Sequence, residues 1–587
     1  MLLPSSRYQC PVWTKLGPFW SPRQLNLQND VISKTERPKY STYPGISHLT
    51  MAGLLFVAMA PQPGLSLDQF HEWYNNEHGP TRLRMPHMFT NGLRYRATDG
   101  QDPEFLAIYD VTNMSLLETP TYTELREHRS PREAETIGQV NVTRRFLDLV
   151  GSQQSPSFVP AEQLTDADAA GRVLIAVEVS LRDTPDAEAE TIRWYTEEHN
   201  PMLSKIPGWL RSRIYRTPAK IEGASTSPVK IITLHEYEKV NGLDGPEHHS
   251  AMSTPWREKV FSSFIADKAR RTYEIFYIFG PGPRELESLS HLPQNASFKT
   301  LDNMISTTAG DSAVISAFVT APDGLHIPYQ LEGNPSADAP TVAFSNSLLT
   351  SLHMWDPLVA LLKTARPDLR ILRYDTRGRH SVPEPPVPAT LDMLASDLAT
   401  LLSALRIPKL HALIGVSMGG ATTLKCALKY PSLVDRFIAC DFNVSSSDAN
   451  TAAWKDRIAV AESPEQGIAA LAKVTVSRWF HEYTMSDRKP VAEWMTQMVA
   501  ENSVQGFRWS CQALWGYDML EEMKGCAVKG LFVVGDGDGK GALVKAMDGF
   551  KGSLGREGAE LKVVERAGHL PMCENPEGFW EAVRDFL

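Results

Sequence analysis

The pattern of apolar residues along the chain changes near residue 280. Before that point, runs such as GLLFVAMA (53–60) and VLIAVEV (173–179) have the length and the aliphatic content of β-strands, and helical stretches separate them. This alternation predicts an α+β architecture for the first half of the chain.

The first half contains an internal repeat. The stretch FHEWYNNEHGP (70–80) corresponds to RWYTEEHNP (193–201), because Trp, Tyr, Glu, His and Pro recur at one offset of 121 residues, from 73 to 194 and from 80 to 201. Each copy begins with a strand and continues with a helix that carries the Trp-Tyr-x-x-Glu-His motif. Three further strands and a second helical stretch complete it. We therefore predict two copies of one unit, at 51–155 and 170–280.

The second half has a different pattern. From residue 313 to 587, short apolar strands alternate with helical segments, which predicts a mostly parallel, doubly wound sheet. Residues 281–312 are rich in Gly, Pro, Ser and Asn and are expected to form a linker. Residues 1–50 show no period, so we expect an extension or a disordered arm and a functional chain that begins near Met51. The strands expected in the C-terminal domain are 314–320, 326–331, 341–344, 369–374, 410–415, 531–534 and 561–565.

Charge and cysteine content narrow the function classes. The chain carries 59 basic and 69 acidic residues, a net charge of −10, which disfavours nucleic acids and anionic membranes as partners. Its six cysteines include no Cys-x-x-Cys pair, which disfavours a cysteine zinc site or a disulfide framework. No run reaches the ~18 apolar residues of a spanning helix. We expect a cytoplasmic protein whose partner is a small-molecule substrate, and homo-oligomers remain open.

The strongest chemical signal is Gly-Val-Ser417-Met-Gly, which lies between an apolar strand and a helical stretch. The two glycines allow the sharp turn that would expose the Ser417 hydroxyl above a sheet edge, as a nucleophile requires. A serine nucleophile needs a general base and an acid that orients the base, in the chain order Ser, Asp or Glu, His. His569, after the last expected strand, is the candidate base.

Two aspartates compete for the role of the orienting acid. The segment GDGDG (535–539) follows the preceding strand, and Asp538 has the Gly-x-x-Asp spacing common there, while Asp536 remains the alternative. For the oxyanion hole we expect the backbone N–H groups of Met418, next to the nucleophile, and of Leu348, in the loop after the strand 341–344. Asn346 and Ser347 of that loop either orient it or contact substrate.

Three segments of the second half resemble one family. The loop FSNSLLTSLHMWDPL (344–358), the run LRYDTRGRHS (372–381) and the turn GVSMGG (415–420) are similar to the corresponding parts of 3-oxoadipate enol-lactonases, which are α/β-hydrolases. The resemblance implies an α/β-hydrolase fold with a lid at about 443–518. Where those enzymes continue Arg-Gly with His-Gly, this chain has Arg-His-Ser (379–381), so its substrate need not be 3-oxoadipate enol-lactone.

The expected lid is rich in aromatic residues and arginines. Its segment Arg478-Trp479-Phe480 is similar to a segment in the lid of enol-lactonases, and we expect Arg478 and Trp479 to contact substrate. Arg457, Arg478 and Arg508 can bind a carboxylate as a bidentate fork, although each is individually more typical of a solvated residue. The aromatic residues either form a pocket for a large, flat substrate or pack the lid onto the core. They are Trp454, Trp479, Phe480, Tyr483, Trp494, Phe507, Trp509, Trp515 and Tyr517.

The repeat of the first half resembles the EthD-like group of the dimeric α+β barrel superfamily, whose units are ferredoxin-like. The resemblance rests on the Trp-Tyr-x-x-Glu-His motif and on the order of the elements, and it implies that the two copies close one barrel within the chain. His78 and His199 suggest a metal or haem site, but adjacent Glu and His point in different directions on a helix. We therefore favour the interpretation that Glu-His-x-Pro ends each helix and that its polar groups satisfy nearby backbone.

These patterns predict a serine hydrolase that cleaves an apolar or aromatic carboxylic ester or lactone through an acyl-enzyme, without metal or organic cofactor. One alternative is hydrolysis of a C–C bond in a β-diketone by the same residues. The other is a bifunctional or binding protein whose tandem barrel binds, cyclises or decarboxylates an aromatic polyketide, which would place the protein in secondary metabolism. The second alternative rests on fold-level analogy.

Overall fold

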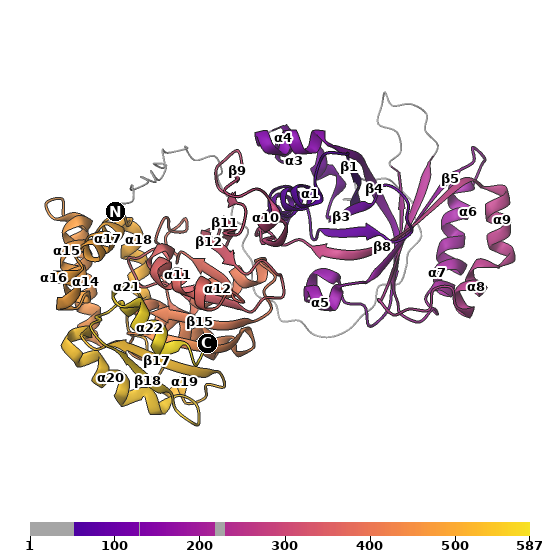
Figure 1. The fold of residues 1–587 in the computed structure, drawn as a ribbon. Helices are drawn as coiled ribbons and strands as arrows, with labels where there is room; N and C mark the ends of the chain where they lie inside the picture. Colours follow the sequence, from indigo (N-terminus) through magenta and orange to yellow (C-terminus); the bar gives the residue numbers. More distant parts are fainter. Residues whose placement is uncertain (1–51, 128, 218–228) are drawn as a thin grey trace. The chain divides into compact units, whose positions relative to one another are not determined.

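The computed structural model describes residues 52–127, 129–217 and 229–587 (Figure 1). The expected N-terminal arm, 1–50, and the expected start at Met51 lie outside the described residues. Among the described residues, no helix combines the length and the apolar character that a membrane crossing requires. We call residues 53–278 the barrel domain and residues 297–587 the sheet domain.

Eight strands close the barrel domain in the order β1-β3-β2-β8-β5-β7-β6-β4. Every pairing is antiparallel, and the two repeats meet where β2 pairs with β8 and β4 with β6. Two repeats in one chain thus close a single barrel, because each leaves two strand edges that the other covers. The strands are β1 (Gly53–Pro61), β2 (Leu93–Ala97), β3 (Phe105–Val111), β4 (Val140–Gln154), β5 (Val173–Leu181), β6 (Trp209–Arg216), β7 (Lys230–Tyr237) and β8 (Ile265–Ile278).

The motif helices do not end at Glu-His-x-Pro, contrary to the interpretation from sequence. Each passes through a π-helical turn, Tyr74–His78 or Tyr195–His199, and continues beyond the proline. A proline inside an α-helix clashes with the carbonyl four residues earlier, and the wider turn removes that clash. The helices of this domain are α1 (Leu67–Trp73), α2 (Gly79–Leu83), α3 (Pro120–Glu127), α4 (Pro131–Gly138), α5 (Asp166–Ala169), α6 (Ala187–Trp194), α7 (Asn200–Leu203), α8 (Pro246–Met252) and α9 (Pro255–Ser263).

The sheet domain has ten strands in the order β18-β17-β16-β15-β13-β14-β12-β11-β10-β9. Strands β13 to β18 are parallel, and β9 to β12 form an antiparallel edge. The strands are β9 (Ser297–Lys299), β10 (Ser306–Thr308), β11 (Val314–Thr320), β12 (His326–Gly333), β13 (Thr341–Ser345), β14 (Arg370–Tyr374), β15 (Leu410–Val416), β16 (Val434–Cys440), β17 (Lys529–Gly535) and β18 (Glu560–Val564).

Two parts of this sheet differ from the sequence-based expectation. The segment expected as a linker, 281–312, contains the short helix α10 (Glu287–His291) and the strands β9 and β10, which pair onto β11. Three-residue strands are too short to show a period, so the composition alone pointed to a linker. Strand β16 was not predicted, because charged residues at its second and third positions interrupt the apolar run VDRFIAC, although its last four residues are buried.

Helices accompany the sheet, and several of them lie in the span expected for the lid. Helices α14 to α17 gather in one group, drawn in orange in Figure 1, and α14 to α18 lie within the span expected for the lid. The helices are α11 (Asp356–Ala365), α12 (Leu391–Ala404), α13 (Met418–Lys429), α14 (Asp448–Glu462), α15 (Gly467–Trp479), α16 (Glu482–Asp487), α17 (Lys489–Ala500), α18 (Val504–Ser510), α19 (Leu520–Met523), α20 (Ala542–Phe550), α21 (Pro571–Glu574) and α22 (Pro576–Val583).

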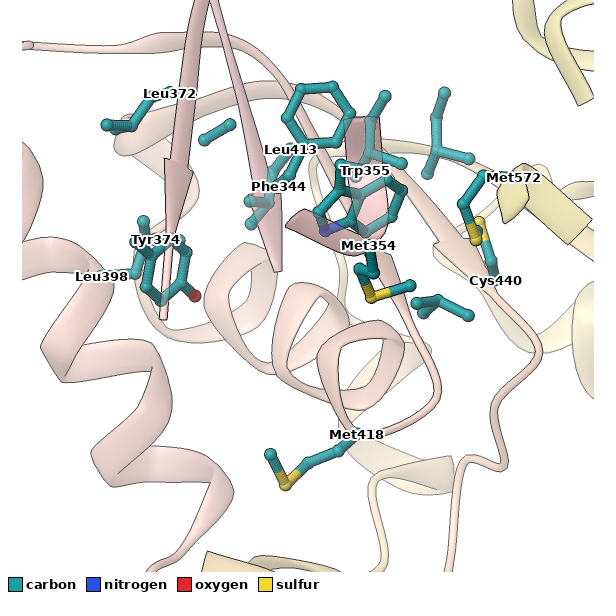
Figure 2. Packing of buried hydrophobic residues seen from close by; sticks show 14 of the residues in the cluster. Phe344, Met354, Trp355, Leu372, Tyr374, Leu398, Leu413, Met418, Cys440 and Met572 are labelled. Atoms are coloured by element: carbon teal, nitrogen blue, oxygen red, sulfur yellow. The ribbon is translucent and has the colours of Figure 1, made fainter. Parts of the chain in front are cut away.

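The core of the sheet domain fixes the carboxyl ends of its strands. Strand β13 is buried at all five positions, as expected of a parallel strand covered on both faces. Figure 2 shows Phe344 of β13 beside Trp355, with ring centroids 4.8 Å apart, and Leu413 of β15 nearby. The Trp355 ring nitrogen donates to Asn346 Oδ1 at 2.8 Å, so the core also holds the loop that leaves β13.

Candidate active site

Ser417 stands on a sharp turn between β15 and α13, which we call the elbow. Its backbone has φ 60° and ψ −120°, a conformation that residues with a Cβ rarely adopt. The neighbouring glycines allow backbone segments around the turn to approach one another closely. A Cβ at Gly415 would lie 2.2 Å from the carbonyl oxygen of Gly419, and one at Gly419 would lie 2.0 Å from that of Ser345. The elbow presents Ser417 at the carboxyl edge of the sheet.

The structure distinguishes the two candidate aspartates by position. His569 Nδ1 lies 2.7 Å from Asp538 Oδ2. Asp536 instead accepts a hydrogen bond from the backbone N–H of Ala567 at 3.2 Å. It also lies 4.0 Å from His481 Nε2. Of the two, therefore, Asp538 contacts the candidate base, while Asp536 braces the turn.

The loop that carries His569 is held by the lid. The backbone N–H of His569 donates to the Trp479 carbonyl at 2.7 Å, and the two rings stack with centroids 5.5 Å apart. Buried Glu574 accepts from the N–H groups of Gly568 and His481, each at 2.7 Å. Burial raises the pKa of Glu574 to about 7. Sequence reasoning missed Glu574, which lies only five residues after His569.

A second buried acid lies behind Asp538. Asp441, directly after β16, accepts from the N–H of Gly535 at 2.9 Å. Burial and the neighbouring Asp538 carboxylate raise the pKa of Asp441 well above its usual range. Asp441, Asp538 and His569 each offer a ligand atom within 4.8 Å of the others, and within this group His569 Nδ1 and Asp538 Oδ2 pair at 2.7 Å.

The candidate oxyanion donors share a cavity with the elbow. Leu348, Ser417, Met418, Asp538 and His569 all line one cavity of about 450 Å³. The loop that carries Leu348 turns sharply, since Leu349 has a φ of 69°. Leu348 and Met418 therefore lie at the same cavity as Ser417.

Asn346 and Ser347, expected as possible substrate contacts, are fully buried and do not line the cavity. The amide of Asn346 donates to the Tyr374 carbonyl at 2.9 Å and also reaches Asp375 Oδ1 at 3.3 Å. Asp375, in the run LRYDTRGRHS, in turn accepts from the N–H of Leu352 at 2.6 Å. Of the two roles considered for this loop, orientation fits their positions, because the side chains point into the core.

The lid contributes one wall of the cavity. Arg478 and Trp479, the expected substrate contacts, line it, and so do Arg457, Trp454 and Tyr517. Burial lowers the pKa of Arg457 to about 10, and proximity to Arg478 adds to the effect. The third candidate arginine, Arg508, does not line the cavity and pairs with Glu462 at 2.9 Å. The remaining lid aromatics pack elsewhere: Phe480, Tyr483, Trp494, Phe507, Trp509 and Trp515.

The histidines of the barrel motif do not form a metal cluster with other ligand residues among the described parts of the chain. His78 Nδ1 pairs with Glu133 at 2.6 Å, and Glu77 accepts from the Ser130 hydroxyl at 2.6 Å. In the second repeat Glu198 accepts from the Thr254 hydroxyl at 2.7 Å. The glutamate side chains thus accept hydrogen bonds from neighbouring side chains rather than from the backbone.

Comparisons with known proteins support the geometry of the sheet domain. The sequence model of the alpha/beta hydrolase fold matches residues 340–576. 3-Oxoadipate enol-lactonase 1 of Acinetobacter baylyi is 30% identical over 277 residues, which cover 47% of this chain and 98% of that protein. The chain belongs to the α/β-hydrolase family. The expected α/β-hydrolase fold of the C-terminal domain and the expected hydrolytic enzyme are thereby confirmed.

Two further proteins that are similar to this chain are also named enol-lactonases. 3-Oxoadipate enol-lactonase 2 of Acinetobacter baylyi is 29% identical over 247 residues, which cover 42% of this chain and 88% of that protein. Among solved structures, the enol-lactonase from Burkholderia xenovorans LB400 is 28% identical, with a TM-score of 0.41; the match covers 46% of this chain and 98% of that one. The α/β-hydrolase match lies entirely within the sheet domain.

Proposed function

We propose that the sheet domain hydrolyses a carboxylic ester or lactone through an acyl-enzyme on Ser417. One observation carries the proposal: the strained elbow serine and the hydrogen-bonded His569–Asp538 pair line the same cavity. A serine placed in this way is activated when a neighbouring imidazole accepts its proton. No metal or organic cofactor takes part in these steps.

The proposed reaction has two halves. Ser417 Oγ attacks the carbonyl carbon while His569 accepts its proton, and the N–H groups of Leu348 and Met418 bind the oxyanion. Asp538 stabilises the imidazolium and keeps Nδ1–H directed at itself. His569 then gives the proton to the leaving oxygen, and water attacks the acyl-enzyme with His569 as the base.

We propose that the substrate carries a carboxylate besides the scissile ester or lactone. Arg457 and Arg478 line the cavity, and neither pairs with a carboxylate within the described parts of the chain. Half-buried guanidinium groups that lack a direct ion pair favour an anionic ligand, because burial weakens their hydration. The stacked ring of Trp479 offers an apolar face beside them. The names of the enol-lactonase relatives agree with a lactone.

For the barrel domain we propose that its two repeats are ferredoxin-like units of the EthD-like kind. The repeated Trp-Tyr-x-x-Glu-His motif and the closed eight-stranded barrel support this assignment.

Labelling with a fluorophosphonate probe tests the proposal, with peptide mass spectrometry to locate the adduct. We expect an adduct on Ser417 that is lost in His569→Ala, because the hydroxyl is not activated without its base. An intact, folded protein that gives no adduct on Ser417 would contradict the proposed triad. Product analysis then separates ester cleavage, which yields an acid and an alcohol or enol, from C–C cleavage, which yields an acid and a ketone.

A further inference from the structure

The barrel domain has a cavity of its own, of about 350 Å³, lined by residues of its second repeat. Residues of β5, β7 and β8 and of the helices α6 to α9 line it. Its walls are largely aromatic, which suits a flat, unsaturated ligand. The rings that line it belong to Trp194, Tyr195, Tyr237, Phe261, His199, His235 and His248.

Three cations line this cavity, Arg257 of α9 and Lys268 and Arg270 of β8. The Arg257 guanidinium lies 4.3 Å from the centre of the Phe261 ring, and the Lys268 ammonium lies 5.6 Å from it. Throughout the described ranges, none of the three pairs with a carboxylate. The only acid in the lining is Asp244, whose side chain is 88% exposed and lies 3.4 Å from His248. The cavity therefore carries positive charge that no described acid neutralises.

The first repeat has an acid at the position where the second repeat has Arg257. In both repeats a hydroxyl begins the second helical stretch and caps the residue three positions later: Ser130 accepts from the N–H of Glu133, and Thr254 accepts from that of Arg257. The two positions are structurally equivalent, yet one carries an acid and the other a base. The acid of the first repeat pairs with the motif histidine, His78.

The motif histidine of the second repeat lacks such a partner. His199 Nδ1, the counterpart of the His78 nitrogen that binds Glu133, is buried and has no hydrogen-bond partner in the described structure. Burial, together with His235 and Arg257, lowers the pKa of His199 well below its usual range. An anion beside α9 would supply the negative charge that Glu133 supplies in the first repeat.

The second repeat also has more space. The strand pairings make Tyr109, opposite Leu55, the counterpart of His235, opposite Ile175. The Tyr109 ring stacks on Phe279 with centroids 5.9 Å apart and so fills the first repeat. The smaller imidazole of His235 leaves room in the second.

We propose that the second repeat of the barrel domain binds an aromatic carboxylate, whose anionic group pairs with Arg257 and whose rings lie against Trp194 and Tyr195. Lys268 and Arg270 attract the anion to the cavity mouth. The two repeats have thus diverged. In the first repeat, Glu133 of the chain itself pairs with the motif histidine. In the second repeat, the carboxylate of the ligand supplies the negative charge.

Calorimetric titration of the full chain with 2-naphthoate tests this proposal, with neutral 2-naphthamide as the matched probe. We expect the acid to bind and the amide to bind at least about 10-fold more weakly, since a charge-assisted bond is lost. Arg257→Gln should weaken the binding of 2-naphthoate at least about 10-fold. Arg257→Glu, which places an acid where the first repeat has Glu133, should abolish binding. Arg193→Gln, an equal charge change at an exposed side chain that does not line the cavity, should leave the affinity unchanged.

Other outcomes would overturn the proposal. They are absence of binding at millimolar 2-naphthoate, equal affinity for acid and amide, and equal affinity in wild type and a folded Arg257→Gln protein. Binding that is lost in Arg478→Gln but kept in Arg257→Gln would place the ligand in the cavity of the sheet domain instead. Circular dichroism of each variant separates loss of the site from loss of the fold.

Discussion

At the residue scale, the site depends on which of several similar side chains meets a particular atom. Asp536 and Asp538 are two residues apart in one turn, but only Asp538 lies against His569. Arg478 and Arg508 both belong to the lid, but only Arg478 lines the cavity. Such pairs provide matched variants, because one member tests the role and the other tests the general effect of the substitution.

The Asp pair yields the first prediction. Asp538→Asn should lower kcat by about 10⁴-fold, because the amide no longer holds His569 in the tautomer that accepts the serine proton. Asp536→Asn should change kcat only a few-fold, since its contact is to a backbone N–H. Steady-state kinetics with an activated ester would measure both. Equal losses in the two variants would contradict the assignment of Asp538.

The second prediction concerns Arg478 and Arg508. Arg478→Gln should raise KM for an ester that carries a carboxylate by about 10- to 100-fold, as loss of a charge-assisted hydrogen bond predicts. Its KM for the corresponding neutral ester should change little. Arg508→Gln removes an ion pair with Glu462 outside the cavity. It should leave the KM values for both esters near those of the wild type. A similar rise for the neutral ester would mean that Arg478 shapes the lid rather than binds a carboxylate.

At the element scale, strand, turn and helix act together to hold Ser417 in a strained conformation. The close approach of Gly415, Gly419 and Ser345 leaves the elbow no room to relax. A non-glycine residue held at positive φ costs on the order of 1 kcal/mol or more of folding free energy. The elbow therefore stores strain that the surrounding sheet compensates.

The third prediction follows from that strain. Ser417→Gly should unfold with a free energy about 1 kcal/mol higher than that of Ser417→Ala, because only glycine adopts φ 60° without strain. Both variants lack the hydroxyl, so the difference isolates the backbone conformation. Urea unfolding of the two proteins gives the comparison. Equal stabilities would show that this turn is relaxed.

At the scale of the whole molecule, the barrel domain encloses several histidines whose burial opposes protonation. His235 is fully buried and hydrogen-bonded to the hydroxyls of Ser212, at 2.8 Å, and Thr233, at 3.1 Å. Burial lowers the pKa of His235 to about 3. The native state therefore keeps this imidazole neutral in a pH range where the unfolded chain takes up a proton.

The fourth prediction concerns acid stability. Between the ordinary histidine pKa of about 6.5 and about 3, the unfolded state binds the extra proton, so native stability falls as the pH falls. In His235→Asn the decrease in unfolding free energy from about pH 7 to about pH 5 should be smaller by about 2 kcal/mol. Urea unfolding at both pH values measures it, with hydrogen exchange assigning the transition to barrel peptides.

A control variant makes this prediction specific. His87→Asn removes an exposed histidine of the same domain and should keep the wild-type decrease. An unchanged decrease in His235→Asn would mean that His235 takes up its proton in the folded barrel.

The amino-acid sequence by itself was enough to predict the two halves of the chain, the repeat, and the strand–turn–helix around Ser417. Each of these depends on short-range order: strand-length apolar runs, a motif repeated at a constant offset, or glycines that a sharp turn requires. Those signals lie within a few neighbouring residues, so they can be read without knowing the fold.

Only the tertiary structure decided which groups meet. Asp441 and Glu574 are ordinary acids in the sequence, and their raised pKa values arise from burial beside Asp538 and the His569 loop. The continuation of the motif helices through π-helical turns and the pairing of β9 and β10 onto the sheet also depend on distant contacts. Contacts between residues far apart in the chain leave no local pattern, because packing in three dimensions selects them.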